Sequence, residues 1–234
     1  MAVITLAYPY AHRKPCTPEG VSAARYSEPH KRDYHDRLRK QASVLATGLR
    51  EAYPGTRTRV CVDSAPIMER SLAYQSGIGF IGKNTQLIVP DHGSYFFLAE
   101  ILTTAPIPFS DPRPMENRCG ACTRCLDACP TGALESPFRL NAAKCLSYRT
   151  IEEKGALDKA TGGKMGDCFL GCDVCQEVCP FNKGSEPGEV LLPPVADFLT
   201  MDAETFRQTF GKTALARAGL AKIQSNIRAM DRHR

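Results

Sequence analysis

Residues 119–130 read Cys-Gly-Ala-Cys-Thr-Arg-Cys-Leu-Asp-Ala-Cys-Pro, and residues 172–180 read Cys-Asp-Val-Cys-Gln-Glu-Val-Cys-Pro. The first stretch spaces four cysteines by two, two and three residues, and the second repeats the later part of that pattern. Of the chain's 11 cysteines, Cys145 and Cys168 stand between these two runs. A secreted disulfide framework would spread its cysteines along the chain, so the clustering predicts metal ligands and a reducing compartment.

This spacing is typical of proteins that hold two 4Fe–4S clusters, in which the last cysteine of each run ligates the other cluster. The crossover predicts one cluster on Cys119, Cys122, Cys125 and Cys179, and a second on Cys129, Cys172, Cys175 and one further cysteine. Cys145 and Cys168 are both available for that last place, and the spacing does not choose between them. Alternatives are a zinc site, which paired cysteines also suit, or inert buried thiols. Cys16 and Cys61 are expected to be ordinary thiols outside the module.

The composition fits an ordinary globular protein, with 43% hydrophobic and 24% charged residues among 234. No apolar run is long enough for a membrane span, and the apolar start at Met1 lacks the basic region of a secretory signal. The formal charge of +5 counts every cysteine as neutral. Thiolate-bound clusters would offset that surplus, so a nucleic-acid partner must be argued from local patches.

The first hundred residues predict alternating strands and helices, hence an α/β layer. The expected elements are a strand at 2–7, a helix at 33–53, a strand at 58–62, a helix that opens at residues 63–66 and ends at 77, and paired strands at 86–89 and 95–102. Asp63 or Ser64 would cap the second helix. Four prolines at 106–114 predict a linker, and helices are expected at 201–210 and 213–230.

Asp63 is a candidate acid because it follows a strand end, where α/β layers bind ligands. The alternative is a simple helix cap. Burial against a flat apolar cofactor would raise the pKa of Asp63 and let it donate a proton. Tyr34 and His35 are either the start of a helix or neighbours of that cofactor. Glu69 and Arg70 are expected to form a surface pair.

Residues 77–82 match the pattern GxGxxG, but they follow a helix rather than a strand, so we reject a nicotinamide-binding fold. Their glycines predict a turn with positive φ or a loop that approaches a large ligand closely. Lys83 and Asn84 follow directly, as a solvated loop or as the polar lip of a pocket.

Several stretches together resemble the epoxyqueuosine reductase family and, more distantly, the reductive dehalogenases. They are 32–35 (Arg-Asp-Tyr-His), 62–70 (Val-Asp-Ser-Ala-Pro-Ile-Met-Glu-Arg), 77–84, 93–97 (Gly-Ser-Tyr-Phe-Phe) and 171–182. The match runs in order through nearly the whole chain. Phe181 departs from the family, in which tryptophan is usual. Family members usually extend further before Ala2 and after Arg234, so we expect a form shortened at both ends.

The resemblance implies an α+β protein in three parts. Residues 1–110 would form a shortened nitroreductase-like domain that binds cobalamin, 111–184 a two-cluster ferredoxin-like domain, and 185–234 a helical tail that begins a helical-repeat region. It also implies Asp63 as proton donor and Cys145 as the eighth cluster ligand. Tyr26, Arg70, Lys83, Asn84 and Ser94 would contact cobalamin.

By the same resemblance, the chain reduces epoxyqueuosine to queuosine at the wobble position of tRNA, with electrons passing through both clusters to cobalamin. A reductant protein would supply the electrons, and we expect a cytoplasmic monomer with no membrane partner. Basic side chains of the tail would hold tRNA unless they are merely solvated: Lys212, Arg217, Lys222, Arg228, Arg232 and Arg234. The rival interpretations are an electron-transfer module without a substrate pocket and a reductive dehalogenase.

Overall fold

The N-terminal half is built on a three-stranded antiparallel sheet of order β1-β7-β4. A computed structural model describes residues 1–10, 13–108, 112–182 and 188–230. The strands are β1 (Ala2–Pro9), β4 (Thr58–Cys61) and β7 (Phe96–Thr103). Glu100 of the central strand lies opposite Thr5 on one side and Cys61 on the other. The strands predicted at 2–7 and 58–62 are confirmed.

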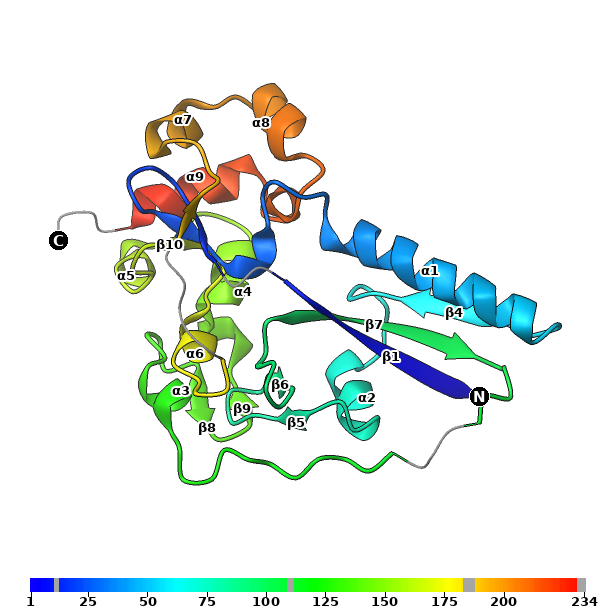
Figure 1. The fold of residues 1–234 in the computed structure, drawn as a ribbon. Coiled ribbons are helices and arrows are strands. Elements are labelled where there is room, and N and C mark those ends of the chain that lie inside the picture. Colours follow the sequence, from blue (N-terminus) through cyan, green and yellow to red (C-terminus); the bar gives the residue numbers. More distant parts are fainter. Residues whose placement is uncertain (11–12, 109–111, 183–187, 231–234) are drawn as a thin grey trace.

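Helices cover both faces of this sheet (Figure 1). Helix α1 (Tyr34–Ala52) buries Leu38, Ala42 and Ala46, one turn apart, against the face of β7 that carries Phe97, Ala99 and Ile101. Its predicted cap is confirmed, because the Asp33 carboxylate accepts the backbone N–H of His35. The short helix α2 (Glu69–Gln75) contacts β1 and β7, on the side to which alternation along β7 directs Glu100.

Two predictions for this half are wrong. The second helix begins at Glu69 rather than near Asp63, and neither Asp63 nor Ser64 caps it. Asp63 has a positive φ of 50°, and Ala65 precedes a proline, so this stretch turns instead of winding. The strands predicted at 86–89 and 95–102 do not pair with each other. Strand β6 (Leu87–Ile88) pairs with β5 (Phe80–Ile81), and β7 lies between β1 and β4.

The cysteine-rich segment consists of short elements between loops. They are α3 (Arg124–Asp127), β8 (Leu134–Ser136), β9 (Arg139–Leu140), η2 (Ala142–Lys144), α4 (Leu146–Ile151), α5 (Lys159–Gly162), β10 (Cys168–Leu170) and α6 (Val174–Glu177). The described part of the predicted linker at 106–114 forms neither helix nor strand, and residues 109–111 lie outside the described ranges.

The C-terminal segment packs on these loops through a shared core of Phe169, Phe198, Phe210, Leu215 and Ile223. Its elements are β11 (Glu189–Val190), α7 (Val195–Thr200), α8 (Ala203–Phe210), η3 (Ala214–Arg217) and α9 (Leu220–Ala229). The helix predicted at 213–230 is interrupted at Gly219, whose φ is +78°. In the described part of the chain, no helix is long and apolar enough to cross a bilayer.

Residues from the N-terminal half also enter this C-terminal half. Strands β2 (Pro15–Cys16) and β3 (Ser22–Ala23) form one sheet with β10 and β11, and the 3-10 helix η1 (Arg25–Ser27) follows them. The boundaries expected near 110 and 185 remain a prediction, and these contacts cross them.

Candidate functional site

A cavity of about 390 Å³ lies between the sheet and the cysteine loops. Tyr10, Tyr26, Tyr34 and Phe97 form an aromatic part of its wall, and Asp63 also lines it. The rings of Tyr34 and Phe97 stack at 4.2 Å between centroids with only 4° between their planes. Asn84, Gln86 and Gln176 add amide groups. Such a mainly apolar surface with a few polar groups is typical of a cofactor or substrate pocket.

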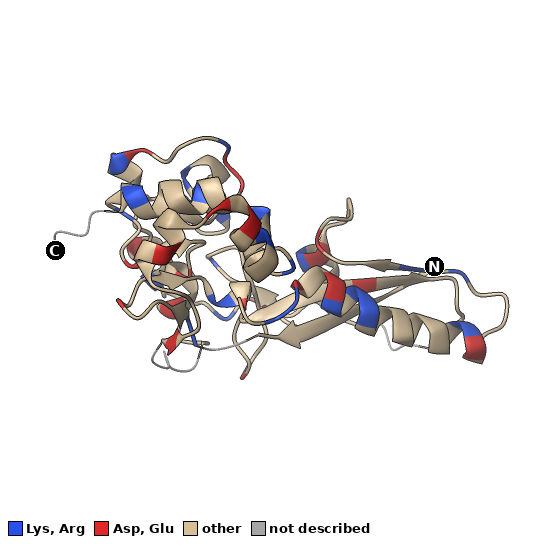
Figure 2. Ribbon diagram, turned by 90° about the horizontal axis from the view of Figure 1, so that it is seen from above, with Lys and Arg blue, Asp and Glu red and all other residues tan. Residues whose placement is uncertain are grey.

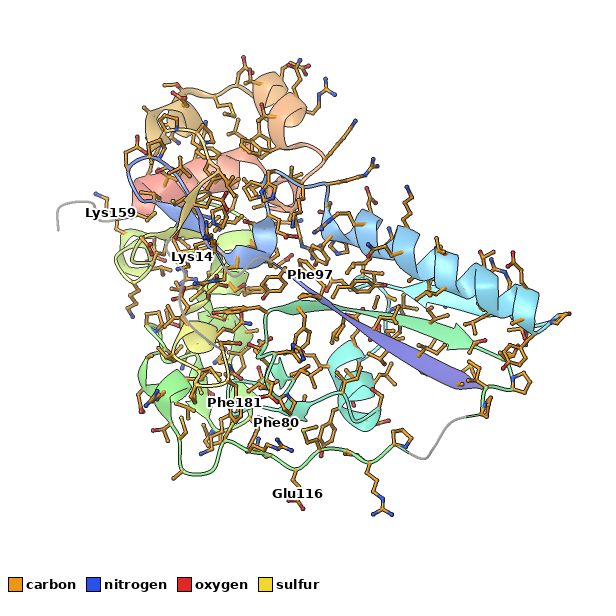
Figure 3. All side chains as sticks on the ribbon, viewed as in Figure 1. Lys14, Phe80, Phe97, Glu116, Lys159 and Phe181 are labelled. Carbon is orange, nitrogen blue, oxygen red and sulfur yellow. The ribbon has the colours of Figure 1, made fainter. Side chains whose placement is uncertain are left out.

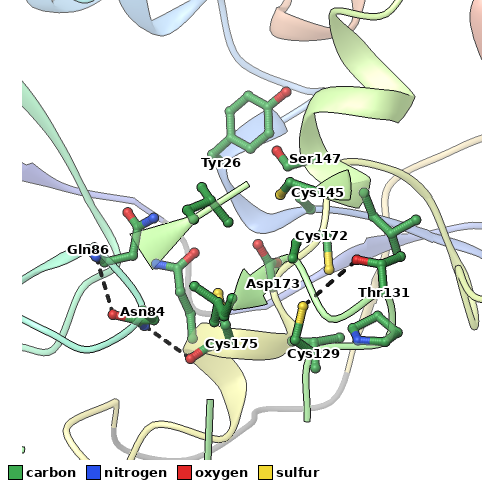
Figure 4. Close-up of a pocket in the computed structure, with 18 of the residues that line it drawn as sticks. Tyr26, Asn84, Gln86, Cys129, Thr131, Cys145, Ser147, Cys172, Asp173 and Cys175 are labelled. Carbon is green, nitrogen blue, oxygen red and sulfur yellow. Dashed lines mark hydrogen bonds between the residues drawn. The ribbon is translucent and has the colours of Figure 1, made fainter. Parts of the chain in front are cut away.

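Four cysteines from three separate segments line the same cavity: Cys129, Cys145, Cys172 and Cys175 (Figure 4). Burial raises the pKa of Cys129, but the backbone N–H groups of Leu134 and Thr131 outweigh it and lower that pKa overall. Cys168 is not among the lining residues. Its buried thiol donates to the carbonyl of Leu170 at 3.3 Å, and burial raises its pKa to about 12.

The other four cysteines of the two runs lie farther from the cavity. Cys119 and Cys179 pack with Phe80 and Ile88 of the β5–β6 hairpin. The Phe80 ring meets Phe181 edge-on at 5.1 Å (Figure 3). Cys179 lies within electrostatic range of Cys119 and Cys122, the cysteines with which the predicted crossover groups it.

No three His, Cys, Asp or Glu side chains among the described residues converge closely enough to hold one metal ion. The thiolates of a cubane cluster bind different iron atoms, so they stand farther apart than the ligands of one zinc ion. The spread of the cysteines is therefore compatible with clusters.

Asp63 lies at the rim of the cavity with 48% of its side chain exposed. Its Oδ2 accepts hydrogen bonds from the Tyr34 hydroxyl at 3.2 Å and faces His35 Nε2 at 2.9 Å. The hydrogen bond with His35 lowers the pKa of Asp63, against the effect of burial. The rise expected from burial against a cofactor stays a prediction; in this structure burial raises the pKa of Asp63, but the imidazole ring outweighs it by stabilising the ionised carboxylate.

His35 stands between two carboxylates. Its Nδ1 is 2.6 Å from Asp33 Oδ1, and the bond of its Nε2 to Asp63 is the largest cause of a raised pKa. Its ring also stacks on Tyr34 at 4.0 Å. The proton of this cluster therefore resides on His35 when Asp63 is ionised. The Asp33-x-His35 spacing offered a signal for the first contact, whereas the second depends on the tertiary fold.

The five predicted cobalamin contacts divide into two groups. Tyr26 and Asn84 line the cavity, and the Asn84 amide donates to the Cys175 carbonyl at 3.1 Å (Figure 4). Lys83, Arg70 and Ser94 are not among the lining residues. They bond to other parts of the protein.

The loop after β5 holds both cysteine loops. Lys83 Nζ donates to the carbonyls of Gly120 at 2.6 Å and Cys122 at 2.9 Å, while Asn84 binds Cys175. Arg70 donates to the Thr85 carbonyl within the same loop. The Lys83 side chain thus faces the first cysteine run rather than the cavity.

Ser94 joins the two halves of the protein. Its backbone N–H donates to Asn182 Oδ1 at 2.7 Å, and its hydroxyl accepts from Gln176 at 3.0 Å. The glycines before Lys83 have structural reasons of their own. Gly77 has a φ of +74° where α2 ends, and a Cβ on Gly79 would lie 2.3 Å from the Ile88 carbonyl oxygen. They serve a turn and a tight hairpin.

A second hollow, of about 560 Å³, shares Tyr26, Tyr34 and Asp63 with the cavity and opens toward η3. Arg217 lines it and binds Glu152 through two bonds of 2.5 and 3.0 Å. Lys222 is buried and donates to the Gly155 carbonyl, so its prediction as a surface contact is wrong. Lys212 and Arg228 are exposed, and Arg232 and Arg234 lie outside the described residues.

Two family descriptions match the chain. Residues 1–64 match "Epoxyqueuosine reductase QueG, DUF1730", and residues 118–182 match "4Fe-4S double cluster binding domain". Epoxyqueuosine reductase of Bacillus subtilis (strain 168) is 40% identical over 204 residues, which cover 83% of this chain and 52% of the relative. That of Synechocystis sp. is 35% identical, over 97% of this chain and 81% of the relative.

Solved structures agree. The Streptococcus thermophilus epoxyqueuosine reductase aligns with a TM-score of 0.86 at 31% identity, over 97% of this chain and 63% of that one. A complex of such a reductase with an epoxyqueuosine-modified tRNA-Tyr stem loop aligns at 0.80, with 35% identity over 97% and 62%. A Bacillus subtilis structure with its aspartate catalytic loop swung out of the active site aligns at 0.78, with 34% identity over the same shares.

The chain thus spans about half the length of the Bacillus subtilis relative and four fifths of the Synechocystis one. It has the mixed α/β fold of the solved reductases together with a double-cluster segment. On both the sequence and the structural match, the chain belongs to the epoxyqueuosine reductase family.

Proposed function

We propose that this chain reduces epoxyqueuosine to queuosine in tRNA. The observation that carries the proposal is a single cavity lined by four cysteines on one side, by an aromatic wall on another, and by Asp63 at its rim. This arrangement puts an electron source, a place for a flat cofactor and an acid around one space, which a simple electron carrier does not need.

We propose that one cluster is held by Cys119, Cys122, Cys125 and Cys179 and the other by Cys129, Cys145, Cys172 and Cys175. The second set favours Cys145 over Cys168, because Cys145 faces the cavity with its three partners while Cys168 is bonded inside strand β10. The family match over residues 118–182 supports two clusters.

Cobalamin is the proposed ligand, with part of the molecule in the cavity beside the cysteines, within a shortened nitroreductase-like domain. The donor set fits such a group, because stacked aromatic rings offer a flat apolar surface and the amides of Asn84 and Gln86 offer polar contacts. When bound, the clusters and cobalamin would supply the two electrons that removal of the epoxide oxygen requires.

The chain's own residues supply the proton. Asp63 Oδ2 lies at the rim, and His35 Nε2 stands 2.9 Å behind it with the proton that its raised pKa retains. The oxygen leaves as water and needs two protons: we propose that one moves from His35 Nε2 to Asp63 Oδ2 and on to the departing oxygen, and that solvent supplies the second by the same route after it reprotonates His35. The Tyr34 hydroxyl orients the same carboxylate.

The substrate would enter from the second hollow, whose lining joins Asp63 to Arg217. A wobble nucleotide turned out of its loop would fit such an entrance, because RNA is read through unstacked bases. Lys212, Arg217 and Arg228 are the proposed phosphate contacts. We further propose that the Asp63 turn moves during the reaction, by analogy with the swung-out catalytic loop of the Bacillus subtilis reductase. A separate reductant protein and a monomeric cytoplasmic enzyme complete the proposal.

The test is mass spectrometry of tRNA nucleosides from a strain that lacks the reductase, with and without this chain. Conversion of epoxyqueuosine to queuosine is the expected result. A chain with intact clusters that leaves epoxyqueuosine unchanged would refute the proposal. Anaerobic reconstitution with cobalamin separates the rivals, since a pure electron carrier retains no corrinoid, and a dehalogenase would instead release halide from a halogenated substrate.

A further inference from the structure

Glu100 is a carboxyl group with no ordinary role in the fold. It lies in the middle of the central strand and is fully buried, with 0% exposure. Among the described residues, no hydrogen-bond donor reaches either of its oxygens, and the hydroxyl of Thr5, opposite it on β1, is also buried without a partner. An ionised carboxylate left this way would be strongly disfavoured, so the position implies a protonated acid.

In the described part of the chain, Glu100 interacts electrostatically with another carboxyl, that of Glu69 at the start of α2. Two carboxyls bond to each other only if one carries a proton. Glu69 is half-buried, and its Oε1 accepts the backbone N–H of Asp63 at 2.5 Å. A chain of contacts therefore runs from the buried strand through Glu69 to the Asp63 turn.

The Asp63 turn needs such support. Its φ of 50° lies in the left-handed region, which aspartate adopts more readily than most residues but which is uncommon outside glycine. No helix cap fixes the turn, because α2 starts only at Glu69 and Met68 makes no capping bond. The bond to Glu69 is thus the contact that ties the backbone of Asp63 to the body of the protein.

We propose that Glu69 and Glu100 share one proton and hold the Asp63 turn in the conformation in which Asp63 contacts Tyr34 and His35. They are then positioning residues for the acid of the proposed reaction, and this role rests on the proposed function. Loss of the shared proton would place two negative charges beneath the turn, break the bond between the carboxyls and release the turn.

The pair has few titratable neighbours. Cys61 faces it from β4, with Arg59 nearby on the same strand, while Asp63 and His35 face Glu69 from the turn and from α1. Burial, followed by the charge of Glu69, raises the pKa of Glu100 to about 8. The turn should therefore be held below that pH and released above it.

The turn can be observed directly because the chain has no tryptophan. Met68 is 76% exposed and adjoins α2, so Met68→Trp supplies a single fluorescent reporter. We expect its anisotropy in the cluster-loaded protein to fall with a midpoint near pH 8. Addition of Glu100→Gln, which cannot lose a proton, should abolish this transition, while Cys61→Ala, which removes the neighbouring thiol, should leave it in place. A transition that survives Glu100→Gln would overturn the proposal.

Kinetics give a second, independent readout. Glu69→Ala should lower kcat on epoxyqueuosine-containing tRNA by roughly 10- to 100-fold with little change in KM, because the acid is misplaced. Glu69→Gln should restore most of the rate, since its amide oxygen still accepts the Asp63 N–H. Equal rates for the Ala and Gln variants would contradict the proposed positioning role of Glu69. If the wild type converts no substrate at any pH, the proposed function fails. The fluorescence titration still tests whether Glu69 and Glu100 hold the Asp63 turn.

Discussion

The carboxylate of Asp63 and the imidazole of His35 form a charged pair at the edge of a mainly apolar cavity. Each partner stabilises the ionised form of the other, so the pKa of the acid falls and that of the base rises. An acid with a lowered pKa is a poor donor unless a neighbour restores its proton. The geometry of the pair, with 2.9 Å between Nε2 and Oδ2, answers that need.

Asp63→Asn tests the carboxylate. The amide keeps the size of the side chain but cannot relay a proton, so we expect turnover to fall by about 100-fold or more while iron content and cobalamin retention stay unchanged. Nucleoside mass spectrometry and visible spectra measure the two effects. Asp36→Asn, at an exposed pair with Arg32 on α1, is the matched control. A near wild-type rate for Asp63→Asn would remove the residue from the mechanism.

His35→Gln tests the positive charge of the protonated His35 ring. The raised pKa of His35 contributes stability that is full below its ordinary value of 6.5 and is lost as the pH rises through the folded value. The lowered pKa of Asp63 contributes stability above 3.8 that is lost as the pH falls. The variant should therefore be less stable than the wild type between pH 3.8 and 6.5, and equal to it well above that window.

Because Asp63 is half exposed, solvent screens the pair, and we expect a difference of roughly 1 kcal/mol in the free energy of unfolding. Urea titrations under anaerobic conditions at pH 6 and at pH 9 measure it. A difference of the same size at both pH values would mean that His35 acts through packing alone.

At the scale of elements, the β5–β6 hairpin and the loop after β5 connect the sheet to both cysteine runs. Phe80 and Ile88 pack on Cys119 and Cys179, and the side chains of Lys83 and Asn84 reach one run each. The hairpin is thus a clamp on the cluster segment, and Lys83 gives it a charged contact with the first run.

Lys83→Met should loosen the first run. The methionine fills similar space but leaves the carbonyls of Gly120 and Cys122 without the ammonium donor. Hydrogen bonds to charged groups contribute about 1.5–3 kcal/mol, so we expect roughly tenfold faster loss of about half the iron on exposure to air. Timed iron and sulfide analysis measures this, with Lys40→Met on the exposed side of α1 as control. Uniform loss from both clusters would contradict the clamp.

The sequence predicts the elements that local rules govern. The alternation of 58–62, the four-residue spacing in α1 and its Asp33 cap are confirmed, because each depends on neighbours in the chain. The partner of a strand depends on residues far away, and so the pairing of β6 was missed. The spacing of the cysteines predicts the clusters. The aromatic wall of Tyr10, Tyr34 and Phe97 could not be predicted, because it forms only when helix α1 packs on the sheet.

Lys83 shows what the sequence alone cannot predict at the site. A lysine beside a glycine-rich loop suggests a pocket lip, but the direction of its side chain depends on where the hairpin docks. Asn84, one residue later, points into the cavity as expected. Neighbouring residues on one loop thus face different surroundings, Lys83 the first cysteine run and Asn84 the cavity, and no local sequence pattern distinguishes them.

At the scale of the molecule, two halves meet at the cavity, and buried polar contacts hold them there. Ser94 binds Asn182 and Gln176, and the buried Arg25 binds Asp173 beside Cys172 and Cys175. Both sets join the N-terminal half to the second cysteine run. Because these groups are buried, the loss of a partner would leave an unpaired polar atom, so the cavity walls keep a fixed spacing.

Acidic and basic residues are mixed along the described part of the chain. Lys and Arg alternate with Asp and Glu over the ribbon (Figure 2), and Arg217 is engaged with Glu152. The proposed tRNA partner would then be held by a few cations, and Lys212 and Arg228 are exposed candidates in the C-terminal segment. Association should depend moderately on salt, in proportion to the phosphates that these side chains neutralise.

The salt dependence of RNA binding tests the roles of Lys212 and Arg228. For an epoxyqueuosine-containing anticodon stem loop, each of Lys212→Ala and Arg228→Ala should reduce the slope of log K against log salt by about 1 if its side chain contacts a phosphate. Fluorescence anisotropy at several salt concentrations measures the slope, and Lys40→Ala, on α1, serves as the control. Slopes equal to that of the wild type in both variants would move the RNA off the C-terminal helices and leave the hollow beside Arg217 as the contact to examine.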